Sequence, residues 1–574
     1  MARPNDEVGA LLQEYADLVA ITGGDAYRAR VYEKAARSVA GYHADVSTLD
    51  AAGLRRIPNV GTSIADKIVA YFRTGHIDVV EELRAKIPAG VRELTAIPTL
   101  GPRKAMVLYD KRGISSVPEL LAALDAGKLT GLKGFGPKTE ENLRHGIELL
   151  QQIGSRVHIN VAMEVAEGIV AELSAVTGCD RCTYAGSLRR MRETIGDIDI
   201  LAASRHPQRL METLTHLDAV SEVIAHGETK TSVRTTHGMQ VDLRVVRPEA
   251  WGAALQYFTG SKPHNVRTRE IAVRQKLKLS EYGLFEVGSG KLIVSKSEDE
   301  VYARLGLPWI PPPLREDRGE IEAALAGELP TLVTQRDIRG DLHTHTNLTD
   351  GVASLGEMVA AAAARGYSYY AITDHAPNLS MQRMTDEKML AQRAEVRALE
   401  GRYGKLRLLH GTELNIDPDG EVDWGPEFLA GFDICVASVH SHFTQSRDEM
   451  TKRLLRACEN PYVNIIGHPT GRLIGQRPPV EADLDAVFKA CARTGTALEV
   501  NAFPDRLDLN DECVLRAKRY GVKFAIDTDA HAVAHLDMLR YGIGTAQRGW
   551  LTRDDVINTW PLRRLKAFLR KGRS

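Results

Sequence analysis

Residues 186–201 read GSLRRMRETIGDIDIL, and this stretch carries two acids, Asp197 and Asp199, among apolar residues. The spacing of two residues is typical of a β-strand and places both carboxylates on one face of it. Two carboxylates on one face repel each other unless a cation lies between them, so the pair predicts a divalent metal site. Because Mg²⁺ prefers few protein carboxylates together with substrate phosphates, we expect a phosphorylated ligand beside it.

The neighbouring residues favour this metal site over the alternative, a solvated strand edge. The turn at Gly186 and Ser187 lets the backbone approach phosphate oxygens closely, and Arg190 can donate two hydrogen bonds to them. A third acid, Asp242, occurs in a second strand-like run at 239–246. Three carboxylates with two metal ions form the usual arrangement for in-line phosphoryl transfer.

The composition limits the class of protein. Its 574 residues are enough for about three to five domains. The chain has 74 Lys and Arg against 75 Asp and Glu, and its first 150 residues have 20 against 19, so a nucleic acid would be held by backbone amides and a few placed side chains. The start MARPNDEVGA lacks a signal-peptide core and no apolar run is long enough for a membrane span, so we expect a cytoplasmic protein without membrane contact. Six cysteines, with one isolated CxxC at Cys179 and Cys182, fit a reducing compartment better than a zinc site.

Three similar segments occur in the first 150 residues, at 57–68, 97–105 and 132–143. In each, a tight turn ends in glycine and leads into a predicted helix, whose free N–H groups and positive dipole end can bind phosphate without net charge. The segments resemble the helix-hairpin-helix motif, which grips the sugar-phosphate backbone of DNA. Three copies favour this interpretation over ordinary helical hairpins. The expected DNA-binding glycines are Gly61, Gly101, Gly134 and Gly136.

Lys67 lies in the helix that follows the first of these turns. It could complement a phosphate by charge, or it could act as a Schiff-base nucleophile toward a ribose aldehyde. The sequence favours the first role, because most lysines are solvated.

The last third of the chain alternates short apolar strands with predicted helices, which predicts a seven-stranded parallel β/α barrel with its loops at one mouth. The expected strands are 341–346, 369–375, 406–416, 432–440, 463–468, 497–501 and 523–531. Imidazoles and carboxylates occur at the strand ends, and this mixture suits Zn²⁺, Mn²⁺ or Fe²⁺ better than Mg²⁺. Nine such residues are enough for three ions and a bridging hydroxide that cuts phosphoesters. The expected ligands are His343, His345, Asp350, His375, Glu413, His440, His468, Asp529 and His531.

The segments GSLRR, ETIGDIDIL and VDLRVV, followed by YFTGSKPHNVRTR at 257–269, resemble the palm and nucleotide-binding segments of family X DNA polymerases. The resemblance continues to GLPWIPPPLRE at 306–316, where the thumb of that family ends. It implies that Asp197 and Asp199 hold two Mg²⁺ or Mn²⁺ ions, that Asp242 binds the catalytic one, and that Lys67 matches a deoxyribose-phosphate lyase lysine. The residues that the resemblance assigns to the nucleotide and template are Gly186, Ser187, Arg190, Gly196, Tyr257, Phe258, Gly260, Asn265 and Arg269.

The C-terminal region resembles the PHP (polymerase and histidinol phosphatase) family over its full length. The motifs DLHTHT, ITDH, GTEL, SVH, GHP and DTDAH are all intact, which implies an active phosphoesterase. Fused to a polymerase, such a domain implies 3′–5′ exonuclease or 3′-end-processing activity. Arg472, just past His468, is expected to contact a phosphate.

Together these features predict a bacterial-type family X DNA polymerase with a PHP nuclease domain, a multidomain α+β and α/β protein. We expect a helical DNA-end-binding domain at 1–90, a helix-hairpin-helix fingers-type domain at 91–154, a polymerase-beta-like nucleotidyltransferase palm at 155–260, a thumb and linker at 261–335, and a distorted TIM-like PHP barrel at 336–574.

The predicted role is filling short gaps during DNA repair. We expect a nucleoid-associated monomer that acts on gapped or primer–template DNA with 5′-phosphate ends and uses dNTPs. Two alternatives are a DNA-end-binding repair scaffold with a relic polymerase site and a small-molecule enzyme with nucleotidyltransferase and phosphatase halves. The hairpin repeats argue against the second, because a metabolite enzyme has no use for DNA-gripping motifs.

Overall fold

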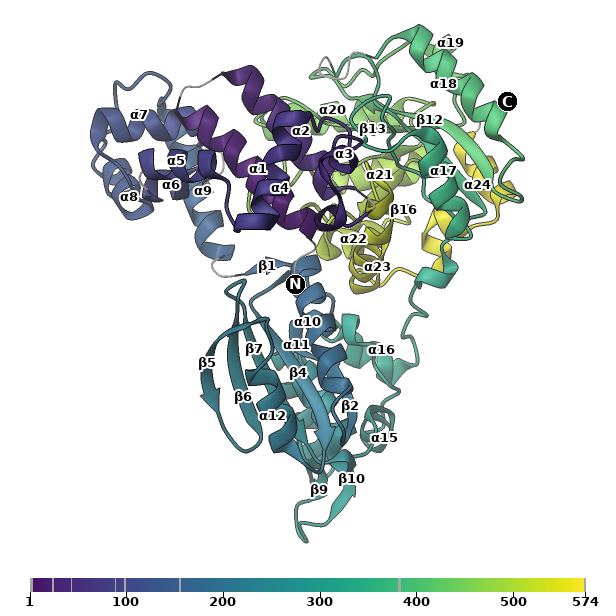
Figure 1. Cartoon of the computed structure of the whole chain (residues 1–574). Helices are drawn as coiled ribbons and strands as arrows, with labels where there is room; N and C mark the ends of the chain where they lie inside the picture. The colour runs from purple at the N-terminus through teal and green to yellow at the C-terminus, as the bar shows by residue number, and fades with distance from the viewer. Residues whose placement is uncertain are drawn as a thin grey trace.

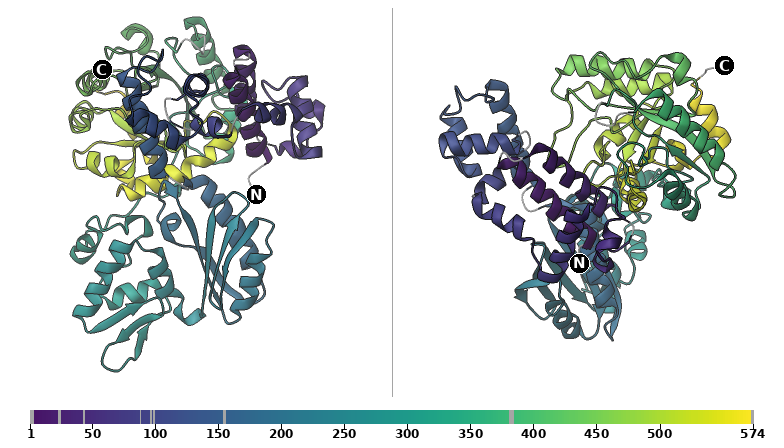
Figure 2. Two further views of the ribbon diagram at one scale, coloured as in Figure 1. Left: turned by 90° about the vertical axis from the view of Figure 1, so that its left-hand side faces the viewer. Right: turned by 45° about the horizontal axis from the view of Figure 1, so that its top comes forward.

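The chain forms three regions, visible in Figure 1 as the N-terminal helices, the palm and thumb below them, and the C-terminal barrel beside them. The computed structural model describes residues 4–22, 25–42, 44–87, 89–95, 97, 100–153, 156–379 and 384–571. Figure 2 shows the palm and thumb side by side beneath the barrel. Across these described ranges, no helix has the length and apolar content needed to cross a membrane.

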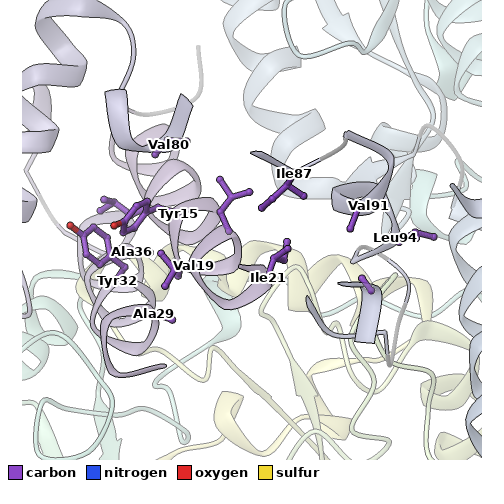
Figure 3. Packing of buried hydrophobic residues seen from close by; sticks show 14 of the residues in the cluster. Tyr15, Val19, Ile21, Ala29, Tyr32, Ala36, Val80, Ile87, Val91 and Leu94 are labelled. Carbon is purple, nitrogen blue, oxygen red and sulfur yellow. The ribbon is translucent and has the colours of Figure 1, made fainter. Parts of the chain in front are cut away.

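The N-terminal region is helical, as predicted, and one hydrophobic core extends through it from Val8 to Ile147. The first two helices pack closely, with the ring centroids of Tyr15 and Tyr32 4.3 Å apart (Figure 3). The helices are α1 (Pro4–Ile21), α2 (Ala26–Ala40), α3 (Ala51–Leu54), α4 (Thr62–Thr74), α5 (Asp78–Lys86), α6 (Ala89–Leu94), α7 (Pro102–Arg112), α8 (Val117–Asp125) and α9 (Pro137–Ile153).

The three predicted hairpin turns share one backbone hydrogen bond. Val60, Leu100 and Phe135 each donate their N–H to the carbonyl three residues earlier, at 3.0–3.1 Å. Asn59 has φ +63° at the position where the third copy has Gly134 with φ +90°. Asparagine tolerates this left-handed conformation, so the turn is kept without glycine. Pro98 and Thr99 of the second copy lie outside the described residues.

The palm is a five-stranded sheet in the order β2-β4-β7-β6-β5, in which only the β4–β7 pair is parallel. The alternation in β4 is the predicted one: Ile198 and Ile200 join the core under α10 (Ile159–Ser174), while Leu201 packs on the other side against α13 (Trp251–Thr259). The strands are β2 (Cys179–Tyr184), β4 (Asp197–Ser204), β5 (Val220–His226), β6 (Lys230–Thr235) and β7 (Gln240–Val246).

The thumb follows α13 and has a small core of its own around Tyr302 and Leu305. Its three strands pair in sequence order. A stretch containing Pro311, Pro312 and Pro313 then leads to the barrel. The thumb elements are α14 (Lys262–Arg274), β8 (Leu277–Ser280), β9 (Gly283–Glu286), β10 (Leu292–Val294) and α15 (Glu298–Arg304), and the linker helix is α16 (Glu320–Ala326).

The C-terminal sheet has six parallel strands in sequence order, β11 to β16. The helices between these strands include α18 (Asp386–Leu399), α20 (Arg447–Glu459), α21 (Leu484–Thr494) and α22 (Asp511–Lys518), while α17 (Leu355–Ala364) precedes β11 and α23 (Leu539–Arg548) follows β16. The strands are β11 (Tyr369–Ile372), β12 (Arg407–Asn415), β13 (Ile434–Ser438), β14 (Ile465–Ile466), β15 (Ala497–Asn501) and β16 (Phe524–Asp527).

The predicted first strand, 341–346, is not a regular strand but joins the two edges of this sheet. It accepts hydrogen bonds from β11 through the Asp341 carbonyl and forms a parallel bridge to Ala530 through Thr344. Its other amides are bound by side chains instead of a strand: Leu342 donates to Asp527 and Thr346 donates to Asp374. The segment therefore connects the two edges of the sheet. It is irregular because buried acids accept some of the hydrogen bonds that a neighbouring strand would otherwise accept.

Candidate metal centres

The three palm acids lie on neighbouring parallel strands. Asp199 on β4 stands directly opposite Asp242 on β7, and Asp197 begins β4 two residues earlier on the same face. Asp197 is exposed, while Asp199 and Asp242 are half-buried. The structure thus places the predicted triad near the N-terminal ends of two inner strands of the palm sheet.

Electrostatics within this triad are uneven. Burial, reinforced by repulsion from Asp197 and Asp242, raises the pKa of Asp199 to about 7. Burial also acts on Asp242, but hydrogen bonds from Lys230, Ser232 and Gln240 outweigh it and lower the pKa of Asp242. Lys230 Nζ lies 2.9 Å from Asp242 Oδ2. Lys230 therefore pairs with Asp242, whereas Asp199 has no such direct ion pair with any described residue and keeps a raised pKa.

The turn before β4 is built around Gly186. Its φ is +56°, and a Cβ atom there would lie 2.1 Å from Asp199 Oδ2, so a side chain at this position would displace the acid. Arg190 follows the short helix α11 (Gly186–Arg189); it donates from Nε to Glu316 at 3.0 Å and from Nη1 to the Thr259 carbonyl at 2.6 Å.

The structure also places three other residues that are predicted to bind the nucleotide, Ser187, Gly196 and Gly260. Gly260 abuts the Arg190 guanidinium, and a Cβ built at Gly196 would lie 3.1 Å from Arg156. Ser187 is half-buried on α11.

The residues predicted to contact the base, sugar and template all have protein partners in this conformation. The Asn265 amide donates to the Tyr257 carbonyl at 2.7 Å and accepts from Gln256 at 2.9 Å, so both of its polar ends are bonded. The ring of Phe258 lies against that of Tyr257 and 5.5 Å from the Arg244 guanidinium. Arg269 donates to the Asn265 carbonyl. The contacts expected of these residues stay predictions.

In the barrel, the Glu413 carboxylate lies at the centre of the predicted ligands. Five imidazole nitrogens approach its two oxygens within 2.9–3.5 Å. A carboxylate offers about four acceptor positions, so five rings exceed what hydrogen bonds alone can satisfy. Burial opposes the charge on Glu413, but His440, His375 and His343 outweigh it and hold the pKa of this acid well below its usual range.

Three overlapping groups among the described residues could each hold a metal ion. They are His345 with Asp350, His375 and His531; His343 with His345 and Asp529; and His375 with Glu413 and His440. The palm acids form no such tight group. His468 lies 3.0 Å from Glu413 and completes the nine predicted ligands.

The donor atoms fit cations better than they fit one another. His343 Nε2 and His345 Nε2 are 3.2 Å apart. A neutral imidazole has only one N–H to donate, so these rings cannot satisfy all their close contacts by hydrogen bonds to one another. His345 Nδ1 and Asp350 Oδ1 are buried without a hydrogen bond. Buried polar atoms are rarely left unpaired, and this set of imidazole and carboxylate donors fits divalent ions.

Residues that the sequence reasoning missed orient these ligands. Glu499, in the middle of β15, accepts from His343 Nδ1 at 2.7 Å, and Asn415 is 2.7 Å from His440 Nδ1. Holding Nδ1 in this way leaves Nε2 facing the centre, which is how second partners of metal-bound histidines act. An acid inside the apolar run ALEVN was the available signal for Glu499.

Arg472 lies at the boundary between barrel and palm, not at the metal centre. It is 7% exposed and donates to Glu193 at 2.6 Å and to the Leu507 carbonyl. This placement does not support the predicted phosphate contact, because the guanidinium is already paired. The arginine beside the ligands is Arg506, whose Nε is 3.9 Å from Asp529.

In the helical region, Lys67 Nζ donates to Ser63 Oγ at 2.8 Å and lies 5.8 Å from the Tyr32 ring centroid. Gly61 and Gly101 precede α4 and α7 as N-cap residues, and no side chain caps either helix; the first residue of α7, Pro102, has no N–H of its own. Gly136 stands just before α9. These are the features that phosphate binding at a helix N-terminus requires.

Comparison with known families and proteins agrees with this layout. Family models match at four places: a helix-hairpin-helix domain at residues 3–77, a SAM-like helix-hairpin-helix tandem at 91–149, the DNA polymerase beta thumb at 254–316 and the PHP domain at 341–503.

Curated relatives cover either the whole chain or one half of it. The DNA polymerase/3′-5′ exonuclease PolX of Bacillus subtilis (strain 168) is 36% identical over 565 residues, 98% of both chains. The rat DNA polymerase lambda is 26% identical over 326 residues, 51% of this chain and 53% of its own. A probable phosphatase of Thermoanaerobacter sp. (strain X514) is 29% identical over 243 residues, 40% of this chain and 94% of its own. The predicted family is confirmed: the chain belongs to the bacterial PolX family, the family X DNA polymerases with helix-hairpin-helix domains and a C-terminal PHP domain.

Proposed function

We propose that this protein extends primers from dNTPs at the palm acids and degrades 3′ ends at the barrel cluster. The observation that carries the proposal is the presence of two separate centres with different ligands, oxygen-only in the palm and histidine-rich in the barrel. Hard carboxylates suit Mg²⁺ or Mn²⁺, and mixed imidazole and carboxylate ligands suit Mn²⁺, Zn²⁺ or Fe²⁺.

At the palm, Asp197, Asp199 and Asp242 would hold two ions, which when bound neutralise the charge of the triphosphate. The backbone at Gly186 and the Ser187 hydroxyl would bind phosphate oxygens. Arg190 would donate further hydrogen bonds to phosphate oxygens from the guanidinium N–H groups that do not bond to Glu316 or Thr259. Asp242 is ionised at neutral pH and would accept the proton of the primer 3′-hydroxyl.

At the barrel, the nine ligands would hold up to three ions, which when bound activate water and neutralise the phosphodiester. Glu499 and Asn415 fix the histidine rings. Arg506 supplies a cation beside the cluster, toward the phosphate of the terminal nucleotide.

The substrate is proposed to be gapped or primer–template DNA with a 5′-phosphate end. The uncapped helices after the hairpin turns would hold its backbone independently of sequence. We place the protein, acting as a monomer, at the bacterial nucleoid in the cytoplasm, because its substrate is chromosomal DNA under repair. Functional boundaries near residues 90, 154, 260 and 335 are part of this proposal; residue 154 lies outside the described residues.

One gel assay tests the proposal. A gapped duplex with a labelled primer and a 5′-phosphate is incubated with dNTPs and Mn²⁺, then without dNTPs. We expect template-directed extension in the first reaction and stepwise shortening in the second. DNA binding without extension would favour the end-binding scaffold instead.

The pKa of Asp199, about 7, predicts a pH-dependent metal requirement for extension. The ion must displace a proton from this acid below pH 7, so its apparent affinity should fall about tenfold per pH unit. We expect the Mg²⁺ concentration for half-maximal extension to rise from pH 7 to 6 and to stay nearly constant from pH 8 to 9. An unchanged requirement from pH 6 to 9 would contradict the assignment.

In the metal-free protein, the raised pKa of Asp199 makes the stability of the fold depend on pH. The folded state holds its proton until about pH 7, whereas the unfolded chain releases it near the ordinary value of 3.8. The resulting stabilisation is complete below the unfolded value and is lost as pH rises through 7.

A lyase role for Lys67 stays a prediction. Its exposure beside Ser63 is compatible with either a phosphate contact or Schiff-base chemistry. Borohydride trapping of Lys67→Ala against wild type on a 5′-deoxyribose-phosphate end distinguishes the two, because only an imine is trapped.

A further inference from the structure

The barrel helix α23 lies directly against residues 186–191 of the palm, called here the nucleotide-binding turn because they include Gly186, Ser187 and Arg190. Tyr541 on α23 and Leu507 belong to the hydrophobic core of the palm, although both are barrel residues. A Cβ built at Gly544 would lie 2.5 Å from Met191 Cε and 2.9 Å from Met191 Cβ. Met191 immediately follows Arg190, so glycine lets the helix approach the turn at van der Waals distance.

The last residue of α23, Arg548, connects the two regions by hydrogen bonds. It is 4% exposed. Its Nη1 donates to the Arg190 carbonyl at 2.9 Å and to Glu316 Oε1 at 2.7 Å. Its Nη2 lies 2.8 Å from Asp511 Oδ2, which also accepts from Arg318 at 2.9 Å. Arg548 therefore holds the backbone of the nucleotide-binding turn and one of the acids that bind its arginine.

Glu316 is shared between the two arginines. The same oxygen, Oε1, accepts from Arg190 Nε at 3.0 Å and from Arg548 Nη1 at 2.7 Å, while Arg192 is more distant at 3.9 Å. A carboxylate left to Arg190 alone would pair with it fully and neutralise it. Because Arg548 takes part of that negative charge, Arg190 keeps positive charge available for a phosphate.

We propose that Arg548 is a positioning residue for the polymerase reaction: from the barrel, it fixes the palm turn and keeps Arg190 available to the triphosphate of the incoming nucleotide. The inference rests on the proposed function, in which Arg190 binds that triphosphate. It makes the PHP barrel a structural component of the nucleotide site, in addition to its own chemistry.

A matched control lies on the same helix. Arg540 also pairs across the boundary, with Glu167 on α10, but this pair is partly exposed and does not touch the nucleotide-binding turn. Arg548→Met and Arg540→Met each remove one interdomain cation and keep an unbranched side chain in place of the stem of the arginine. They differ in whether the lost contact leads to Arg190.

The test measures dNTP binding by full-length protein on a primer terminated with a dideoxynucleotide, which prevents chemistry. We expect Arg548→Met to raise the dNTP Kd about 5- to 20-fold, the range of ordinary coupling between sites. Its affinity for the DNA alone and its 3′–5′ degradation should match wild type. In primer extension, KM for dNTP should rise much more than kcat falls. Arg540→Met should leave all of these quantities unchanged.

Two results would overturn the inference: a dNTP Kd for Arg548→Met within twofold of wild type, or an equal rise in Arg540→Met. If Arg548→Met loses degradation as well, it is misfolded, and Glu316→Gln becomes the test. That variant should remove the dependence on the guanidinium at position 548, so that Glu316→Gln with Arg548→Lys binds dNTP as Glu316→Gln alone does; a further rise would contradict the shared-carboxylate arrangement. Failure of wild type to extend any primer would instead refute the proposed function.

Discussion

Replacing Asp197 by alanine is expected to reduce primer extension at least about 10³-fold while 3′–5′ degradation continues at the wild-type rate. Asp197 begins β4 beside Asp199 and faces the same edge as Asp242. Removing one carboxylate of a two-metal site costs several kcal/mol of transition-state stabilisation, which corresponds to roughly this factor. Single-turnover extension on gapped DNA, with degradation of the same DNA measured in parallel, checks both halves of the expectation.

The control for this variant is Asp218→Ala, which removes an exposed palm acid between α12 (Pro207–Thr215) and β5. It should extend primers as wild type does. Because Asp197 is itself exposed, its loss should leave folding intact, and retained degradation would confirm that. Extension by Asp197→Ala within tenfold of wild type would show that the palm acids are not the synthetic centre.

Replacing Glu413 by glutamine is expected to have the converse effect, with degradation reduced at least about 10³-fold and extension unchanged. Glu413 is 1% exposed and lies within 3.5 Å of five imidazoles. The amide keeps the shape of the side chain but removes the charge that offsets the bound cations, so metal affinity should fall. Degradation assays and measurement of bound metal on the purified variant check this prediction.

Glu427→Gln is the matched control, because it makes the same change at an exposed glutamate at the start of α19 (Pro426–Leu429) in the barrel. It should retain both its bound metal and its nuclease activity. Full degradation by Glu413→Gln, or nuclease activity in wild type that survives exhaustive chelation, would refute a metal-dependent cluster around Glu413.

The local pattern was sufficient wherever one short stretch fixes the geometry. The alternation in β4 separates Ile198 and Ile200 from the acids, and it follows from strand periodicity alone. The first and third hairpin turns were predictable because each has a residue that tolerates the left-handed conformation, Asn59 or Gly134, at the same backbone position. The clustering of the nine predicted barrel ligands was predictable because each occurs at or near the end of an apolar strand, where such folds carry their chemistry.

Side-chain partners across the chain were not predictable in the same way. Arg472 was expected at a phosphate, but its partner Glu193 lies 279 residues away in sequence. Glu499 was read as part of a core strand, and its contact with His343 spans 156 residues. A charged side chain pairs with whichever group the packing brings near it. The pattern of a single sequence does not show which distant residues pack together.

Spacing within a few residues was enough to predict which acids the palm brings together and which nine residues cluster in the barrel, and their roles as metal ligands stay predictions. How the two centres relate follows only from the packing of distant elements. That packing closed the barrel with the irregular segment 341–346, placed Lys230 on Asp242, and brought Arg548 to Arg190 across 358 residues of chain. These outcomes depend on burial and on long-range charge pairing, which arise only when distant elements pack together.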